Sequence, residues 1–172
     1  MPFTILVSCD SKRTAFRECI KQICAESHGE YQYRYIPDEV APANERDRLQ
    51  RMLDLVRDSD MVFMDATPAK GLLNRADHHA TNSGVLIEYG VLVSKDPYME
   101  RLRVFCDKSV SRSFLHPYIL KTVHDFDGND SESLKVKVIK MIEDYKARLP
   151  EMIRKQREEL EAYKQISRIN KA

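Results

Sequence analysis

Three short apolar runs constrain the fold of this chain more than any other feature. They are FTILVSC (3–9), MVFMD (61–65) and LRVFC (102–106). A strand with one exposed face alternates apolar and polar residues, whereas a strand covered on both faces is apolar almost throughout. The runs therefore predict strands in the interior of a sheet that has helices on both of its faces.

The segments between these runs have the periodicity of amphipathic helices. After the first run, one face of a predicted helix carries Phe16, Cys19, Ile20, Ile23 and Cys24. Asn44 is a candidate N-cap for a second helix, in which Leu49, Met52, Leu53 and Val56 share a face. A closing helix is predicted from Leu134, Val138, Met141, Ile142, Tyr145 and Leu149.

Two more segments are candidate strands. YQYRYIP (31–37) alternates and ends at Pro37, and TVHDF (122–126) is a short fifth candidate. Strands that alternate with helices predict an α/β fold with a mostly parallel sheet of about five strands flanked by helices. We expect the arrangement to be flavodoxin-like or Rossmann-like, with a helical extension at the C-terminus.

The C-terminal extension is predicted to begin at Pro150, which gives an α/β domain over 1–149 and a helical tail over 150–172. Proline ends or kinks a helix, or occupies the first position of a new one. Arg154 and Glu158 are four residues apart, as in a solvated helix, and apolar residues in the tail are sparse. Two interpretations stay open, a helix that lies along the domain or frays in solvent and a helix that serves in oligomerisation.

Charge and composition exclude several classes of partner. The formal net charge is +1, so no strong field favours a nucleic-acid polymer or an acidic membrane surface. The first apolar run is too short to span a membrane and lacks a basic leader. We therefore expect a cytoplasmic protein without a membrane or nucleic-acid partner.

The metal-binding residue types are not arranged as a metal site. The four cysteines, Cys9, Cys19, Cys24 and Cys106, form no C-x-x-C pair, and they are expected to be reduced, structural thiols. His78 and His79 lie in the aperiodic segment 66–82 without further ligands at a suitable spacing. We expect no metal, and exposed loop histidines.

Polar residues follow several of the predicted strands. In open parallel sheets, ligands bind beyond the carboxyl ends of the strands. Here these ends are SCDSKRT (8–14), DATP (65–68), the 66–82 segment with the helix after it, and DKSVSR (107–112). Lys12 and Arg13, beside a helix N-terminus, suit a phosphate, and the alternative is a capped helix with two solvated cations. Asp65 is either a site residue or a carboxylate that holds its own loop.

Glu88 is the one charged residue within TNSGVLIEYGVLVS (81–94). It follows the candidate N-caps Asn82 and Ser83 by little more than one turn, where the helix dipole stabilises a negative charge. A carboxylate in apolar surroundings near a ligand edge is a candidate nucleophile or base. The alternative is a glutamate on the exposed side of the helix, or one paired with a lysine or arginine.

The order of these motifs resembles a known group of proteins. MVFMDATP, the long segment after it, N-S-G-V-L-I-E-Y-G and then RVFC are similar to the nucleoside 2-deoxyribosyltransferase-like group. The related Toll/interleukin-receptor-like nucleotide-binding domains also carry an asparagine shortly before an E-x-G helix. The resemblance covers roughly residues 3 to 110, and N-S-G-V-L-I-E-Y-G is its most specific element.

This resemblance implies an enzyme that cleaves the N-glycosidic bond of a nucleotide, either NAD or a nucleoside monophosphate, by hydrolysis or by transfer to another base. Glu88 matches the catalytic glutamate that attacks the sugar, and Asp65 matches a residue that could handle the proton on the leaving base. The matched substrate-binding residues are Asn82, Ser83 and Gly84, with Ser8, Cys9 and Asp10 at the first strand, beside Lys12 and Arg13. No cofactor is implied, because NAD would be a substrate. The resemblance also implies that the protein is a homo-oligomer.

Two other functions fit the same residues. The chain could sense a nucleotide or cyclic nucleotide without cleaving it and signal through oligomerisation. Alternatively, it could be a protein-interaction domain in which the pocket is vestigial. Turnover that depends on Glu88 distinguishes the enzyme from both alternatives.

Overall fold

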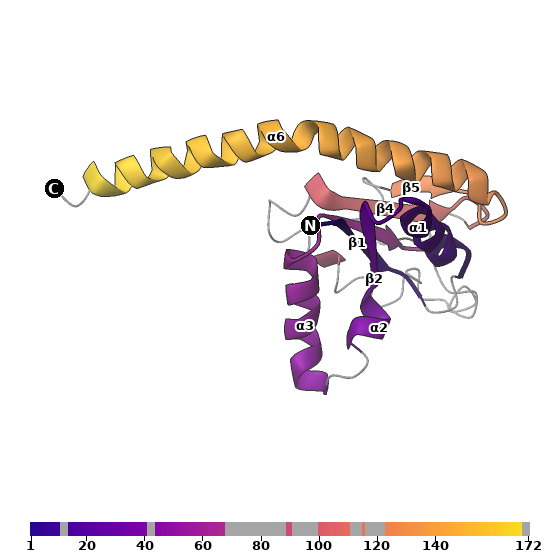
Figure 1. Ribbon diagram of the computed structural model, residues 1–172. Coiled ribbons are helices and arrows are strands. Elements are labelled where there is room, and N and C mark those ends of the chain that lie inside the picture. Colours follow the sequence, from indigo (N-terminus) through magenta and orange to yellow (C-terminus); the bar gives the residue numbers. More distant parts are fainter. Residues whose placement is uncertain are drawn as a thin grey trace. The chain divides into compact units, whose positions relative to one another are not determined.

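The computed structural model describes residues 1–10, 14–40, 44–67, 89–90, 100–110, 115 and 123–169, without the side chains of 45, 46 and 165–169. The described strands form one sheet in the order β2-β1-β3-β4-β5, and every neighbouring pair is parallel (Figure 1). The predicted α/β fold is confirmed. Of the two arrangements expected, this strand order is the flavodoxin-like one.

The strands lie close to where the apolar runs predicted them. They are β1 (Phe3–Ser8), β2 (Tyr31–Tyr35), β3 (Met61–Asp65), β4 (Leu102–Asp107) and β5 (Val123–Phe126). The second strand ends earlier than expected, because Ile36–Val40 forms the short helix α2. Pro37 lies in the first turn of α2, where its missing N–H group leaves no helical hydrogen bond unmade.

Helices α1 (Thr14–Glu26) and α3 (Glu45–Arg57) form where the periodicity of apolar residues predicted them. The five apolar side chains expected on one face of α1 are all buried. Asn44 caps α3 as predicted, since its side chain accepts a hydrogen bond of 3.0 Å from the Asp47 N–H. The expectation for Leu49 is wrong, because its side chain is 51% exposed while Leu55 is buried. The first turns of α3 extend past the strands of the sheet (Figure 1).

The face of the sheet that packs on α1, called the α1 face here, holds an aromatic cluster. Phe105 of β4 lies at its centre, with ring centroids 5.4 Å from Phe16 of α1, 6.1 Å from Phe63 of β3 and 6.3 Å from Phe126 of β5. All four phenylalanines are buried. The cluster therefore joins α1 to three neighbouring strands directly below their carboxyl ends.

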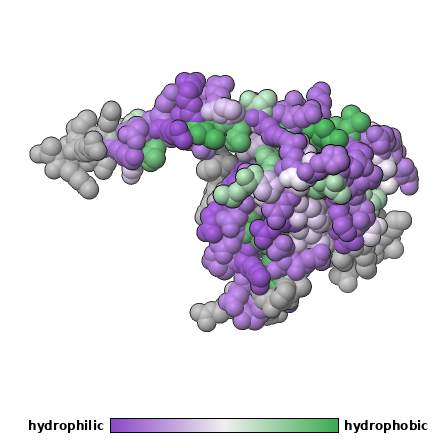
Figure 2. Space-filling view, viewed as in Figure 1, coloured by the Kyte–Doolittle hydropathy of each residue, from purple (hydrophilic) through white to green (hydrophobic). Residues whose placement is uncertain are grey.

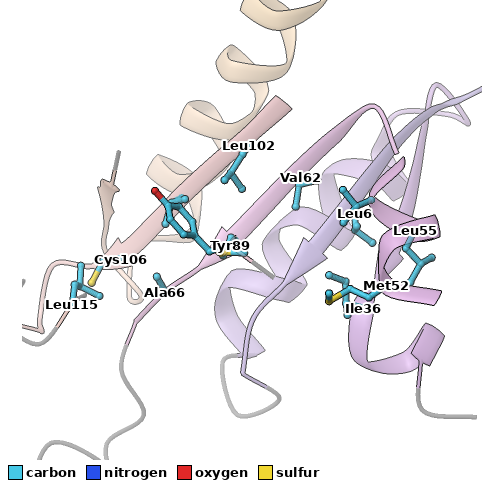
Figure 3. Packing of buried hydrophobic residues seen from close by; sticks show 13 residues of the cluster. Leu6, Ile36, Met52, Leu55, Val62, Ala66, Tyr89, Leu102, Cys106 and Leu115 are labelled. Carbon is cyan, nitrogen blue, oxygen red and sulfur yellow. The ribbon is translucent and has the colours of Figure 1, made fainter. Parts of the chain in front are cut away.

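The opposite face of the sheet, called the α3 face here, has an aliphatic core. The alternate strand residues Leu6, Val62 and Val104 lie in this cluster with Met52, Leu55 and Val56 of α3. Figure 3 shows Tyr89 among these side chains, in the same cluster as Ala66 and Cys106. Tyr89 is 7% exposed, so the position after Glu88 is anchored in the core of the sheet.

The C-terminal helix α6 (Ser131–Ile169) is one continuous element that contains Pro150. Pro150 therefore neither ends the helix nor begins a new one. The chain groups into two compact units, 1–137 and 138–172, and the change of unit comes within α6, before Pro150. The division expected between residues 149 and 150 stays a prediction.

The surface of the described residues is mostly hydrophilic on the face shown in Figure 2, with hydrophobic side chains in small groups. On α6, the side chains of Ile153, Leu160 and Tyr163 are exposed. Whether this exposure serves self-association stays a prediction. Among the described helices, no segment has both the length and the apolar character needed to cross a bilayer.

All four cysteines are free and buried, as expected for reduced thiols. Burial is the main cause that raises the pKa of Cys9 and Cys24 to about 12 and that of Cys19 and Cys106 to about 11. At pH 8 the folded protein is therefore expected to react with an aromatic disulfide reagent at least about a hundredfold more slowly than the unfolded chain, because the thiolate is the nucleophile. A thiol that reacts quickly in the folded protein would contradict this burial.

Candidate functional site

A cavity of about 170 Å³ opens at the carboxyl edge of the sheet, above the aromatic cluster. Its described lining comes from the start of α1, from the ends of β3, β4 and β5, and from the turn after β5. The lining residues are Thr14, Ala15, Phe16, Asp65, Asp107, Phe126, Gly128 and Asn129. The predicted convergence of strand ends on one edge is therefore observed for these elements.

The alternation of the strands brings the two carboxylates of the cavity together. Asp65 lies two residues after Phe63 and Asp107 two residues after Phe105, so both aspartates share the α1 face with the aromatic cluster. The register pairs Asp65 with Phe105, which places Asp107 one step further along the edge. The cavity thus has an aromatic wall, from Phe16 and Phe126, and two acidic groups.

Thr67, two residues after Asp65, connects the two aspartates. Its N–H group donates to Asp65 Oδ1 at 2.9 Å, and its hydroxyl also donates to Asp65 Oδ1. The same hydroxyl accepts a hydrogen bond of 2.9 Å from the Asp107 N–H. Asp65 is 1% exposed and Thr67 is 3% exposed, so these bonds are shielded from water.

The Asp107 carboxylate is held against the turn that follows β5. Its Oδ1 accepts a 2.9 Å hydrogen bond from the Ser109 N–H. On the other side lies Gly128, where an added Cβ atom would come within 2.7 Å of Asp107 Oδ2. A glycine at this position is what permits the turn to approach the carboxylate so closely.

Asp65 lies near two buried thiols, those of Cys9 and Cys106. For Cys9, burial and then the Asp65 carboxylate raise the pKa to about 12. For Cys106, burial raises the pKa to about 11, and the nearby Asp65 carboxylate acts in the same direction. Both thiols therefore remain protonated at neutral pH, and the site has no thiolate at these positions.

A neighbouring cavity of about 200 Å³ lies between the end of β5 and the start of α6. Lys108 and Lys137 line it, but each already has a partner. Lys108 Nζ lies 2.9 Å from Asp127 Oδ2, and Lys137 Nζ donates to the Asp125 carbonyl at 2.5 Å. A hydrogen bond from Lys108 lowers the pKa of the Asp127 carboxyl. Both ammonium groups of this second cavity are thus already engaged, one by a carboxylate and one by a backbone carbonyl.

Of the residues predicted from the sequence, the structure brings Asp65 to the cavity. Ser8 and Cys9 are buried, and neither they nor Asp10 belong to the described lining of the cavity. Lys12, Arg13, Asn82, Ser83, Gly84 and Glu88 lie outside the described residues, as do His78 and His79. Their roles stay predictions.

Several residues that line the cavity or hold its carboxylates were not identified from the sequence. Thr67 and Asp107 lie in the segments DATP and DKSVSR, which were expected at the edge, but no role had been assigned to either residue. Gly128 and Asn129 were missed altogether. The signal for them was the turn sequence DGND (127–130) directly after a short strand, a composition typical of a tight turn.

Comparison with known proteins adds no assignment to this site. No protein-family model matches the chain, and no curated protein matches it. Within the part of the chain that the structure describes, no group of three or more His, Cys, Asp and Glu side chains could hold a metal ion.

Proposed function

We propose that this protein is an enzyme that cleaves the N-glycosidic bond of a nucleotide, with Glu88 as the nucleophile. The observation that carries the proposal is the cavity at the carboxyl edge of a flavodoxin-like sheet, with Asp65 and Asp107 in its wall. It is supported by the resemblance of N-S-G-V-L-I-E-Y-G (82–90) to the glutamate motif of the deoxyribosyltransferase-like group.

The anchoring of Tyr89 is the second support. Tyr89 packs on the α3 face with Ala66 and Cys106, the residues next to Asp65 and Asp107 in sequence. The cavity, in contrast, opens on the α1 face. In this proposal the substrate lies at the carboxyl edge of the sheet, where ligands bind in other open α/β sheets.

The nature of the cavity favours the sugar or the base of a nucleotide over its phosphate. Two carboxylates repel a phosphate, but they accept hydrogen bonds from sugar hydroxyls and attract a cationic base. The aromatic wall suits a ring. The volume of about 170 Å³ is below the roughly 300–1,000 Å³ of complete ligand pockets, so the cavity would take one part of the substrate. In this proposal the phosphate lies against Lys12 and Arg13.

The chemistry requires little general-acid help. Attack by the Glu88 carboxylate on the anomeric carbon breaks the C–N bond, and the bonding electron pair leaves with the base. Nicotinamide in NAD is cationic and leaves as a neutral molecule, which makes it the easiest of the candidate leaving groups. Water or a second base then displaces Glu88 from the sugar, giving hydrolysis or transfer.

The test is a chromatographic assay of the purified protein with NAD, NADP and a panel of ribo- and deoxynucleoside monophosphates. Release of a free base is the expected result, and the compound that yields it identifies the substrate. If no compound loses its base, the enzyme proposal is overturned. Binding of the same panel without turnover would then support a nucleotide-sensing domain.

A further inference from the structure

For each hydrogen bond of the Thr67 hydroxyl, the donor and the acceptor can be determined. The Asp107 N–H group can only donate, so the Thr67 hydroxyl must accept from it through a lone pair. The single hydroxyl proton is then directed to Asp65 Oδ1, which also receives the Thr67 N–H. Asp65 Oδ1 is therefore a double acceptor, and donors of this kind stabilise an ionised carboxylate.

We propose that Thr67 is a positioning residue that holds Asp65 in the cavity as an ionised hydrogen-bond acceptor. This inference rests on the proposed function. By bonding to Asp65 and to the backbone of Asp107, Thr67 also sets the spacing of the two carboxylates across β3 and β4. In this role Asp65 accepts a hydrogen bond from a substrate hydroxyl, and it does not supply a proton to the leaving base. The structure thus assigns Asp65 a role different from the one that the resemblance implied.

The thiols near Asp65 do not interfere with a measurement of its protonation. Cys9 follows β1, and Cys106 and Asp107 belong to β4. The pKa of Cys9 is raised to about 12 and that of Cys106 to about 11, mainly by burial. Neither thiol titrates in the acidic range, so a thiol does not contribute to a titration measured there.

The experiment compares Thr67→Val, which keeps the shape of the side chain without the hydroxyl, with Thr67→Ser, which keeps the hydroxyl. In the valine variant the acidic limb of the pH–activity profile is expected to shift to higher pH by roughly one to two units, because a hydrogen bond to a charged group is lost. The serine variant should retain the wild-type profile. Thr67→Ala replaces Thr67→Val if the valine variant does not fold.

A second readout does not require turnover. Carbon NMR of labelled aspartate carboxyls, with the Asp65 signal assigned from Asp65→Asn, measures the titration midpoint of Asp65 directly. A midpoint that rises in Thr67→Val and returns in Thr67→Ser supports the inference. An unchanged midpoint overturns it, even if the variant has a lower melting temperature. If the wild type releases no base, the proposed function fails, and the NMR titration alone decides the role of Thr67.

Discussion

Glu88→Gln is expected to lower the rate of base release by roughly a thousandfold or more. The amide has the shape of the carboxylate but is a poor nucleophile and carries no negative charge to stabilise an oxocarbenium-like transition state. Ground-state contacts with the nucleotide change little, so the dissociation constant should stay within a few-fold of the wild-type value. Single-turnover kinetics and a direct binding measurement separate the two effects.

The matched control for this substitution is Glu143→Gln, the same chemical change at an exposed position of α6. It should leave both turnover and affinity unchanged. If Glu88→Gln kept more than about a tenth of the wild-type rate, Glu88 would not be the nucleophile. A loss of affinity equal to the loss of turnover would instead indicate that Glu88 only binds the nucleotide.

Phe105→Ala is expected to lower the free energy of unfolding by about 3–5 kcal/mol. Phe105 is 0% exposed, and its ring contacts Phe16, Phe63 and Phe126. Its removal leaves a cavity at the junction of α1 with three strands. A loss of this size is a large part of the roughly 5–15 kcal/mol stability of an ordinary domain. Urea denaturation followed by circular dichroism measures it.

Two further variants make the result specific to packing. Phe105→Leu keeps most of the volume and should cost less than about 1.5 kcal/mol. Val136→Ala, at an exposed position of α6, should change the stability by no more than about 0.5 kcal/mol. A cost below about 1 kcal/mol for Phe105→Ala would contradict the packing of the aromatic cluster. Because Phe16 and Phe126 also line the cavity, the alanine variant should bind nucleotide more weakly as well.

The positions of the strands were predictable from the sequence because burial on both faces demands apolar residues almost without interruption. The segment MVFMD (61–65) alone predicts a strand, and β3 covers the same five residues. The cap of α3 was also local, since the Asn44 side chain accepts a hydrogen bond from a residue only three positions away. Helix faces were less certain. Periodicity identifies the apolar face of α3, but it does not tell which side chains on that face become buried, and Leu49 is exposed.

The site depended on tertiary structure to a greater extent. Asp65 could be chosen from the sequence because it is a polar residue at the end of a buried strand. Thr67, which connects it to Asp107, lies 40 positions from Asp107 in the sequence, and the two residues meet because β3 and β4 are neighbours in a particular register. The close approach of Gly128 to Asp107 depends in the same way on β5 lying beside β4.

The sequence by itself thus determined the class of the fold, the strands and the cap of α3, because each of these follows from burial patterns and hydrogen bonds within a short segment. Only the tertiary structure decided the flavodoxin-like strand order, the shared face of Asp65 and Asp107, and the direction of the Thr67 hydrogen bonds. These features arise between segments that are distant in sequence, where strand pairing and register, and not local composition, set which side chains meet.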